Sequence, residues 1–159
     1  MADPTIAAAR DILSDSLDEL RKALDGCSAD QLNLRPAGDD TNGLAVLATH
    51  ALGSTRSWLS VAVAAPLPDR DRDAEFLVVV DDPSAFLAAF DVTAAECRAL
   101  LATEAPFEAG RVGMAPWRTY GSDEPVTAAW ALLHAVEHLR EHVGHAQLTR
   151  QLSGEGPGT

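Results

Sequence analysis

Apolar residues recur at three- and four-residue intervals along most of the chain, which is the period of an amphipathic helix. In the first such stretch, Asp3 is a possible helix cap, Pro4 falls in the first turn and Gly26 ends the pattern. The pattern predicts four helices, over about residues 4–25, 43–64, 83–104 and 125–152. Between them, glycine, proline and charged residues interrupt the period. We therefore expect an all-α fold.

The link between the second and third predicted helices is long, at about 18 residues (65–82). A direct turn between antiparallel neighbours needs only a few residues, so this length favours a connection that crosses the bundle and leaves the two helices parallel. Within the link we interpret "DRDRD" (69–73) as a solvated loop and "FLVVV" (76–80) as a short strand or buried connector. The prediction is a four-helix bundle with a long crossover connection between helices 2 and 3. A surface loop without fixed structure is the alternative for the link.

Composition agrees with one helical domain. Hydrophobic residues make up 47% of the 159 residues and aromatic residues only 5%, as is typical of Ala- and Leu-rich helices. A chain of this length can bury a core without disulfides or a structural metal. We expect residues 1–152 to form a single domain and residues 153–159 to form a flexible tail.

Charge and hydropathy limit the partners. The formal net charge is −12 and the Lys and Arg residues are scattered, so nucleic acid is not an expected partner. We see no apolar run long enough to span a membrane and no export signal, and we expect no membrane association and a cytoplasmic location. Cys27 and Cys97 are far apart and form no CxxC motif, which is typical of ordinary thiols.

Four of the five histidines lie in "LLHAVEHLREHVGHAQL", residues 132–148: His134, His138, His142 and His145. On a helix they fall within about 80° of one face, and neighbours are roughly 4.5–6 Å apart along the axis. Neighbouring pairs can therefore share one metal ion, whereas His134 and His142, about 12 Å apart on the same rise, cannot. The helical geometry alone does not choose among the neighbouring pairs.

A site built on such a pair needs a third ligand, and the only other histidine is His50, on the second predicted helix. Its neighbours there are apolar, and a buried imidazole requires a partner. Three imidazoles would leave coordination positions open, which is typical of catalytic rather than structural zinc sites. Histidines that only line a surface or an interface are the alternative interpretation.

A second motif competes with this interpretation, because "HAVEH" and "HLREH" both match the H-x-x-E-H pattern of inverted zinc proteases. Such a protease also needs a downstream carboxylate ligand, and Glu155 is the only glutamate after His142. We therefore disfavour the protease, and interpret Glu137 and Glu141 as partners of the metal-ligating imidazoles or as surface charges.

Other residues are candidates for lining a substrate site. The loop before the last helix contains "PWRTYG", in which Arg118 could bind a substrate carboxylate beside Trp117 and Tyr120. Trp58 lies on the same predicted helix as His50, where core packing is the alternative role. For the loop, the alternative is an aromatic clamp on the bundle with Arg118 in solvent.

The chain resembles the DinB/YfiT-like superfamily of metalloenzymes, near the branch of mycothiol-dependent maleylpyruvate isomerase. The similar segments are "LRKALDGCSADQLNLRP", "TNGLAVLATHALGSTRSWL" and, most specifically, "LLHAVEHLREHVGHAQL" with its His-x-x-x-His motif. The resemblance implies a four-helix bundle with a crossover connection, which often forms homodimers. It also implies that His50, His138 and His142 are the metal ligands. His134 and His145 would then line the cleft or support the ligands.

The resemblance further implies an activity. In this superfamily a divalent ion, zinc or nickel, activates a low-molecular-weight thiol such as mycothiol or bacillithiol for S-transfer or isomerisation on an electrophilic substrate. A metal lowers the pKa of a bound thiol or water, so the chain would need no catalytic cysteine of its own. The alternatives are a non-catalytic bundle that binds a metal or a small ligand, as a stress or sensor protein, and a dimerisation module with incidental histidines.

Overall fold

The computed structural model describes residues 3–103, 105–115 and 125–154. Its elements, in chain order, are α1 (Pro4–Leu24), α2 (Ala29–Asn33), the 3-10 turn η1 (Gly38–Asp40), α3 (Leu44–Val63), α4 (Arg72–Glu75), α5 (Pro83–Leu100), β1 (Val112–Gly113), β2 (Val126–Thr127) and α6 (Ala128–Leu152). Within the described residues, α1, α3, α5 and α6 are the four long helices, and they confirm the predicted all-α bundle.

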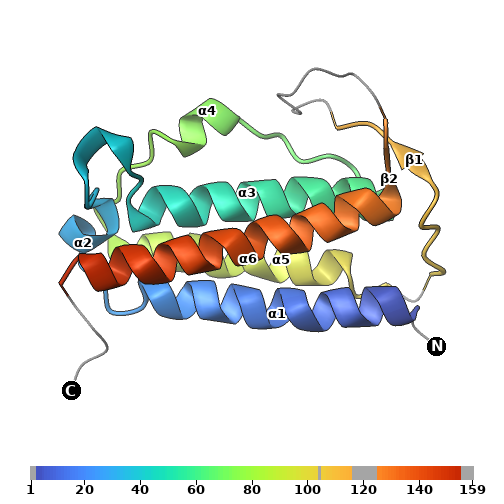
Figure 1. Cartoon of the computed structure of the whole chain (residues 1–159), viewed down its shortest axis with the longest axis horizontal. Helices are drawn as coiled ribbons and strands as arrows, with labels where there is room; N and C mark the ends of the chain where they lie inside the picture. Colours follow the sequence, from blue (N-terminus) through green and yellow to red (C-terminus); the bar gives the residue numbers. More distant parts are fainter. Residues whose placement is uncertain (1–2, 104, 116–124, 155–159) are drawn as a thin grey trace.

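The four long helices pack as a closed ring of neighbours: α1 against α6, α6 against α3, α3 against α5, and α5 against α1. Figure 1 shows that α3 and α5 run in one direction and that α1 and α6 run in the other. The apolar faces point inward, and the fully buried side chains of the core come from all parts of the ring, among them Leu13, Leu17, Leu59, Leu101 and Leu139. Burial of these faces is the main source of helix stability in such a bundle.

The connection between α3 and α5 returns along the whole length of α3, on the outside of the bundle (Figure 1). It begins at Ala64, whose φ of 58° ends α3 in a left-handed turn, and it contains the single turn of α4. Because the chain returns to its starting end before α5 begins, α3 and α5 are parallel. The predicted crossover is therefore confirmed.

Local sequence explains where the helices begin. The side chain of Asp3 accepts hydrogen bonds from the backbone N–H of Thr5 and Ile6, with Pro4 in the first turn of α1. Asp82 and Pro83 repeat this arrangement at the start of α5. These caps satisfy amide groups that have no partner inside the helix.

Two helix boundaries differ from the predicted ones. The last helix begins at Ala128 rather than near Pro125, because Val126 and Thr127 pair with β1 as an antiparallel ladder and the Thr127 hydroxyl accepts from the Trp130 N–H. The third helix ends at Leu100, about four residues earlier than predicted. Propensity alone does not locate helix ends exactly, and pairing with β1 decides the start of α6.

The "FLVVV" segment forms no strand in the structure. It follows α4 as a turn and an extended connector in which Val80 is buried, whereas Leu77 and Val79 are 77% and 72% exposed. Asn33 holds the buried end, because its side chain both donates to the Val80 carbonyl and accepts from the Val80 N–H. The connector alternative is the one that the structure supports.

α3 is the most enclosed of the long helices, because it packs against α6 and α5 and is also covered by α2 and α4. Most of its side chains are buried, including those of His50 and Trp58. None of the described helices is both long and apolar enough to cross a membrane.

The packing of α6 predicts unequal costs for two leucine truncations on the same helix. Leu139→Ala removes a fully buried side chain and should lower the free energy of unfolding by about 2–5 kcal/mol. Leu133→Ala removes a side chain that is 67% exposed and should change it by less than about 0.5 kcal/mol. Urea denaturation followed by circular dichroism measures both, and equal costs would contradict this orientation of α6.

Candidate metal centre

Three imidazoles converge between α3 and α6. His50 comes from the N-terminal half of α3, and His138 and His142 come from successive turns of α6, which runs antiparallel beside α3 (Figure 1). One ring nitrogen from each of the three residues lies within 4.8 Å of the other two. His50 is buried and the other two are half-buried. This grouping joins residues almost 90 positions apart in the sequence, and it is the set that the family resemblance implied.

The distance between the two imidazoles of α6 suits a shared divalent ion. Their Nε2 atoms are 3.3 Å apart. Two nitrogens that bind one tetrahedral zinc ion at the usual bond length of ~2.0–2.1 Å are roughly 3.3–3.4 Å apart. The Nδ1 atoms of His138 and His142 are buried and have no hydrogen-bond partner among the described residues. Three imidazole nitrogens within 4.8 Å of one another fit a divalent metal ion of the zinc type.

His50 is held in one orientation by Glu75 of α4. Its Nδ1 lies 2.8 Å from Oε2 of Glu75, and both side chains are about nine-tenths buried, at 10% and 8% exposure. An ionised carboxylate can only accept, so Nδ1 carries the proton, and Nε2 is the nitrogen of His50 that can offer a lone pair to a metal. An imidazole that donates to a carboxylate through one nitrogen and presents the other is the usual arrangement of a metal-binding histidine.

Arg70 fixes Glu75 in turn. Its Nε donates to Oε1 over 2.6 Å and its Nη2 donates to Oε2 over 2.8 Å, so the contact is bidentate. Burial by itself would raise the pKa of Glu75, but the hydrogen bonds from Arg70 and His50 outweigh it and lower that pKa below the ordinary value. Glu75 is therefore an ionised carboxylate at neutral pH. It links Arg70 to His50, because it accepts hydrogen bonds from both.

The two imidazoles of α6 are neutral over a wide pH range. Burial, with a smaller contribution from the neighbouring imidazoles, lowers the pKa of His138 from 6.5 to about 4. The same causes lower the pKa of His142 from 6.5 to about 4. A neutral imidazole has a lone pair free for a metal, whereas an imidazolium has none.

The other two histidines of α6 lie beside the centre. The ring of His134 stacks on Trp130 at 4.8 Å and touches the edge of Trp58 at 4.9 Å, and its Nδ1 lies 3.2 Å from Oε2 of Glu137. Glu137 therefore partners His134 and not one of the three converging imidazoles. The ring of His145 lies 5.6 Å from that of His142.

The remaining candidate residues have mixed outcomes. Trp58 is 4% exposed and belongs to the hydrophobic core, as expected if its role is core packing. Glu141 is exposed on α6. Trp117, Arg118 and Tyr120 lie outside the described residues, and their role in substrate binding stays a prediction.

Sequence reasoning missed Arg70 and Glu75. The "DRDRD" segment was expected to be a solvated loop, and this is wrong for Arg70, whose side chain is only 7% exposed beside Glu75. α4 has four residues, too few to show a helical period. A charge pattern alone does not distinguish a buried ion pair from a surface one, so the sequence contained no clear sign of this contact.

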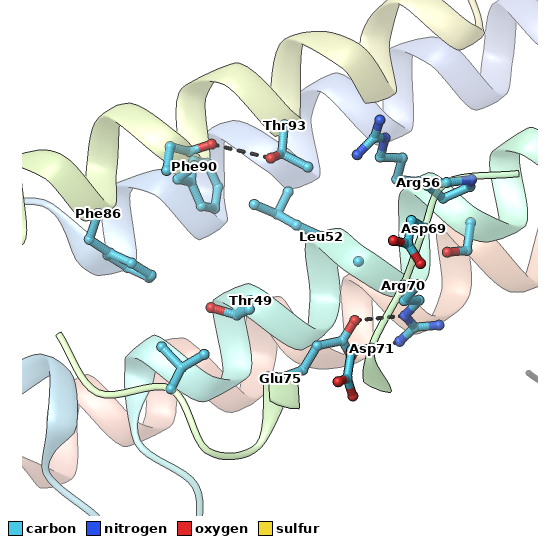
Figure 2. Close-up of a pocket in the computed structure, with 15 residues that line it drawn as sticks. Thr49, Leu52, Arg56, Asp69, Arg70, Asp71, Glu75, Phe86, Phe90 and Thr93 are labelled. Carbon is cyan, nitrogen blue, oxygen red and sulfur yellow. Dashed lines mark hydrogen bonds and ion pairs between the residues drawn. The ribbon is translucent and has the colours of Figure 1, made fainter. Parts of the chain in front are cut away.

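Arg70 and Glu75 also border a cavity of about 340 Å³ between α3, the connection and α5. Figure 2 shows the two side chains joined by a hydrogen bond at one side of this cavity, with Phe86 and Phe90 of α5 facing them across it. Because Glu75 also contacts His50, it is shared by the cavity and the imidazole cluster.

Cys97 does not supply a nucleophile. Its side chain is fully buried in the core cluster, and burial raises the pKa of the thiol from 9.0 to about 12. A thiolate is the reactive form of cysteine, and it is scarce at neutral pH when the pKa is that high.

Comparison with known proteins agrees with the fold. The structure is similar to the crystal structure of a conserved protein from Enterococcus faecalis, with a TM-score of 0.72 and 18% sequence identity over 95% of this chain and 98% of the other. At this identity the likeness shows the fold alone. No curated protein matches the sequence.

The fold and the imidazole cluster together define a helical bundle of the DinB/YfiT-like class. Residues 8–154 match the family described as mycothiol-S-transferase. The chain therefore belongs to the mycothiol S-transferase family, and the resemblance found in the sequence is confirmed.

The lowered pKa values of His138 and His142 predict how the metal-free protein responds to acid. Below pH 6.5 the unfolded chain protonates both imidazoles, whereas the folded chain does so only near pH 4. The unfolded state then binds more protons, so the free energy of unfolding should fall as the pH falls from 6.5 towards 4. Urea denaturation in EDTA at several pH values measures this slope.

In the same experiment His138→Gln, which cannot take up a proton, should give a shallower slope than the wild-type protein over that pH window. Equal slopes in the two proteins would contradict a neutral, buried His138.

Proposed function

We propose that the protein is a metal-dependent S-transferase that joins a low-molecular-weight thiol of the mycothiol or bacillithiol type to an electrophilic small molecule. His50, His138 and His142 would bind the divalent ion. The observation on which the proposal depends is the convergence of these three imidazoles, with the proton of His50 held on Nδ1 by Glu75. Membership of the mycothiol S-transferase family supports the thiol as the co-substrate.

The chemistry of the donor set supports the same class of reaction. A divalent ion bound to three neutral imidazoles would lower the pKa of a thiol that binds at an open position, and would so supply a thiolate at neutral pH. The buried thiol of Cys97 is unsuited to this role. In the proposed reaction the thiol loses its proton, its sulfur forms a bond to the electrophilic carbon, and the leaving group departs.

The residues of the chain would orient the reactants. Glu75 keeps the Nε2 lone pair of His50 directed away from α4, and Phe76 packs its ring 4.8 Å from the His50 ring and limits the access of water on that side. The Arg72 guanidinium lies 5.2 Å from the centre of the Phe76 ring. It places a positive charge near the cluster in a protein of net charge −12, where it would attract an anionic substrate.

Several finer predictions from the sequence extend this proposal. They are zinc or nickel as the ion, a homodimeric assembly, a cytoplasmic location, and substrate contacts from Trp117, Arg118 and Tyr120.

Metal content tests the ligand set. Protein purified without a His-tag and reconstituted with zinc or nickel should contain about one equivalent of metal per chain, and His138→Ala should reduce this to below about 0.1 equivalent because two imidazoles bind too weakly to survive desalting. His145→Ala, on the same face of α6, serves as the control and should keep the full content. Mass spectrometry of the bound metal measures all three, and retained metal in His138→Ala would refute this ligand set.

Turnover separates an enzyme from a metal-binding protein. With mycothiol and monochlorobimane, the metal-loaded protein should form the fluorescent thioether and release chloride faster than the buffer alone, since the bound thiol is ionised. His50→Ala should react at the rate of the buffer. If the wild-type protein reacts no faster than His50→Ala with mycothiol, bacillithiol or glutathione, the result favours a non-catalytic bundle that binds a metal or a small ligand.

A further inference from the structure

Gly53 of α3 lies directly beneath the pair formed by Arg70 and Glu75. A side-chain carbon at this position would overlap Oε1 of Glu75, and would lie 3.1 Å from Cδ of Glu75 and 3.4 Å from Nε of Arg70. The overlap is with the oxygen that accepts the bond from Arg70 Nε. Only a residue without a side chain therefore lets this carboxylate lie against α3.

Backbone conformation does not explain a glycine here. Gly53 lies inside an α-helix and is not among the residues with positive φ, so any residue could adopt its backbone conformation. Glycine destabilises the interior of a helix relative to alanine. Its presence in α3 thus has a cost in helix stability, and the space occupied by Glu75 is the feature of the structure that accounts for it.

Glu75 could not avoid a methyl group at position 53 and keep its contacts. Its two carboxylate oxygens accept from Arg70 over 2.6 and 2.8 Å, and Oε2 also accepts from His50 over 2.8 Å. A shift of the carboxylate away from α3 would lengthen the bond to His50, which lies on the same helix one turn earlier. The cavity of about 340 Å³ that Glu75 borders offers room for the displaced side chain (Figure 2), so the chain would still fold.

We propose that Gly53 is a positioning residue for the metal centre: its missing side chain lets Arg70 and Glu75 close against α3, and Glu75 then holds His50 in the tautomer that binds metal. The inference rests on the proposed metal site. It adds Gly53, which faces Oε1 of Glu75, as a residue that determines metal affinity, whereas His50 contacts Oε2. Loss of a carboxylate that orients a metal-ligating histidine typically weakens metal binding about 10- to 100-fold.

The test compares two glycine substitutions in α-helices. Gly53→Ala should weaken Co²⁺ binding by about 10- to 100-fold, while urea denaturation and circular dichroism show that the metal-free variant remains folded. Gly144→Ala on α6 is the matched control, because a side-chain carbon there meets no atom of the described residues within 4 Å, and it should bind Co²⁺ as the wild-type protein does. The visible absorption of bound Co²⁺ measures affinity and reports any change in coordination.

Introducing Gly53→Ala into a protein that already lacks the Glu75 carboxylate separates a positioning role of Gly53 from a general effect on packing. If Gly53 acts only through Glu75, then Gly53→Ala should have no further effect on Co²⁺ affinity once the carboxylate is absent, in Glu75→Ala. If Glu75→Ala does not fold because Arg70 is left unpaired, Glu75→Gln is used instead. The double variant Gly53→Ala/Glu75→Gln should then lose less Co²⁺ affinity than the product of the two single-variant losses. Fully multiplicative effects would overturn the proposal, as would a Gly53→Ala variant with wild-type affinity.

Nitrogen NMR of the metal-free protein provides a readout that needs no metal. His50 should carry its proton on Nδ1 in the wild-type protein and in Gly144→Ala, and should exchange between the two tautomers in Gly53→Ala. An unchanged His50 tautomer in Gly53→Ala would overturn the positioning role. If the wild-type protein binds no Co²⁺, the proposed metal site is refuted. If Gly53→Ala in that case still loses the Nδ1-protonated tautomer of His50, the role of Gly53 in placing Glu75 is supported.

Discussion

The Glu75 carboxylate, which accepts from Arg70 through both oxygens and from His50 through Oε2, is the contact on which the geometry of the site depends. It attaches the long connection between α3 and α5 to the most enclosed helix of the bundle. A buried carboxylate is costly without partners, and here each oxygen has at least one. The same carboxylate decides which nitrogen of His50 is protonated. A contact that attaches the connection to α3 therefore also sets the chemistry of the imidazole.

The remaining geometry follows from two long helices packed side by side. α6 places His138 and His142 one turn apart, and the neighbouring α3 supplies His50 from its buried face. Positions on packed helices are more rigid than positions on loops, so the three nitrogen atoms approach the spacing that a small ion requires with little reorganisation. The half-buried environment keeps His138 and His142 neutral. Packing, burial and ligand chemistry thus favour the same state of the site.

Much of this arrangement could be predicted from the sequence, because it depends on local periodicity. The four long helices, their approximate bounds and the parallel pair joined by the crossover all follow from helical spacing, caps and the length of one link. The His-x-x-x-His motif placed two imidazoles on one helical face, and the family resemblance supplied His50. The start of α6 at Ala128 could not be predicted in this way, because it depends on the pairing of β2 with β1, which helical periodicity does not reveal.

By itself, the sequence determined which stretches form the four long helices, which of their faces are apolar and which histidines share a face, since these properties repeat every few residues. Only the tertiary structure decided that Arg70 and Glu75 are buried, that Glu75 rather than Glu137 partners a converging histidine, and that Gly53 lies beneath them. These contacts join α4 and a residue just before it, in an irregular connection, to the N-terminal half of α3. No period relates such positions, so only the folded chain brings them together.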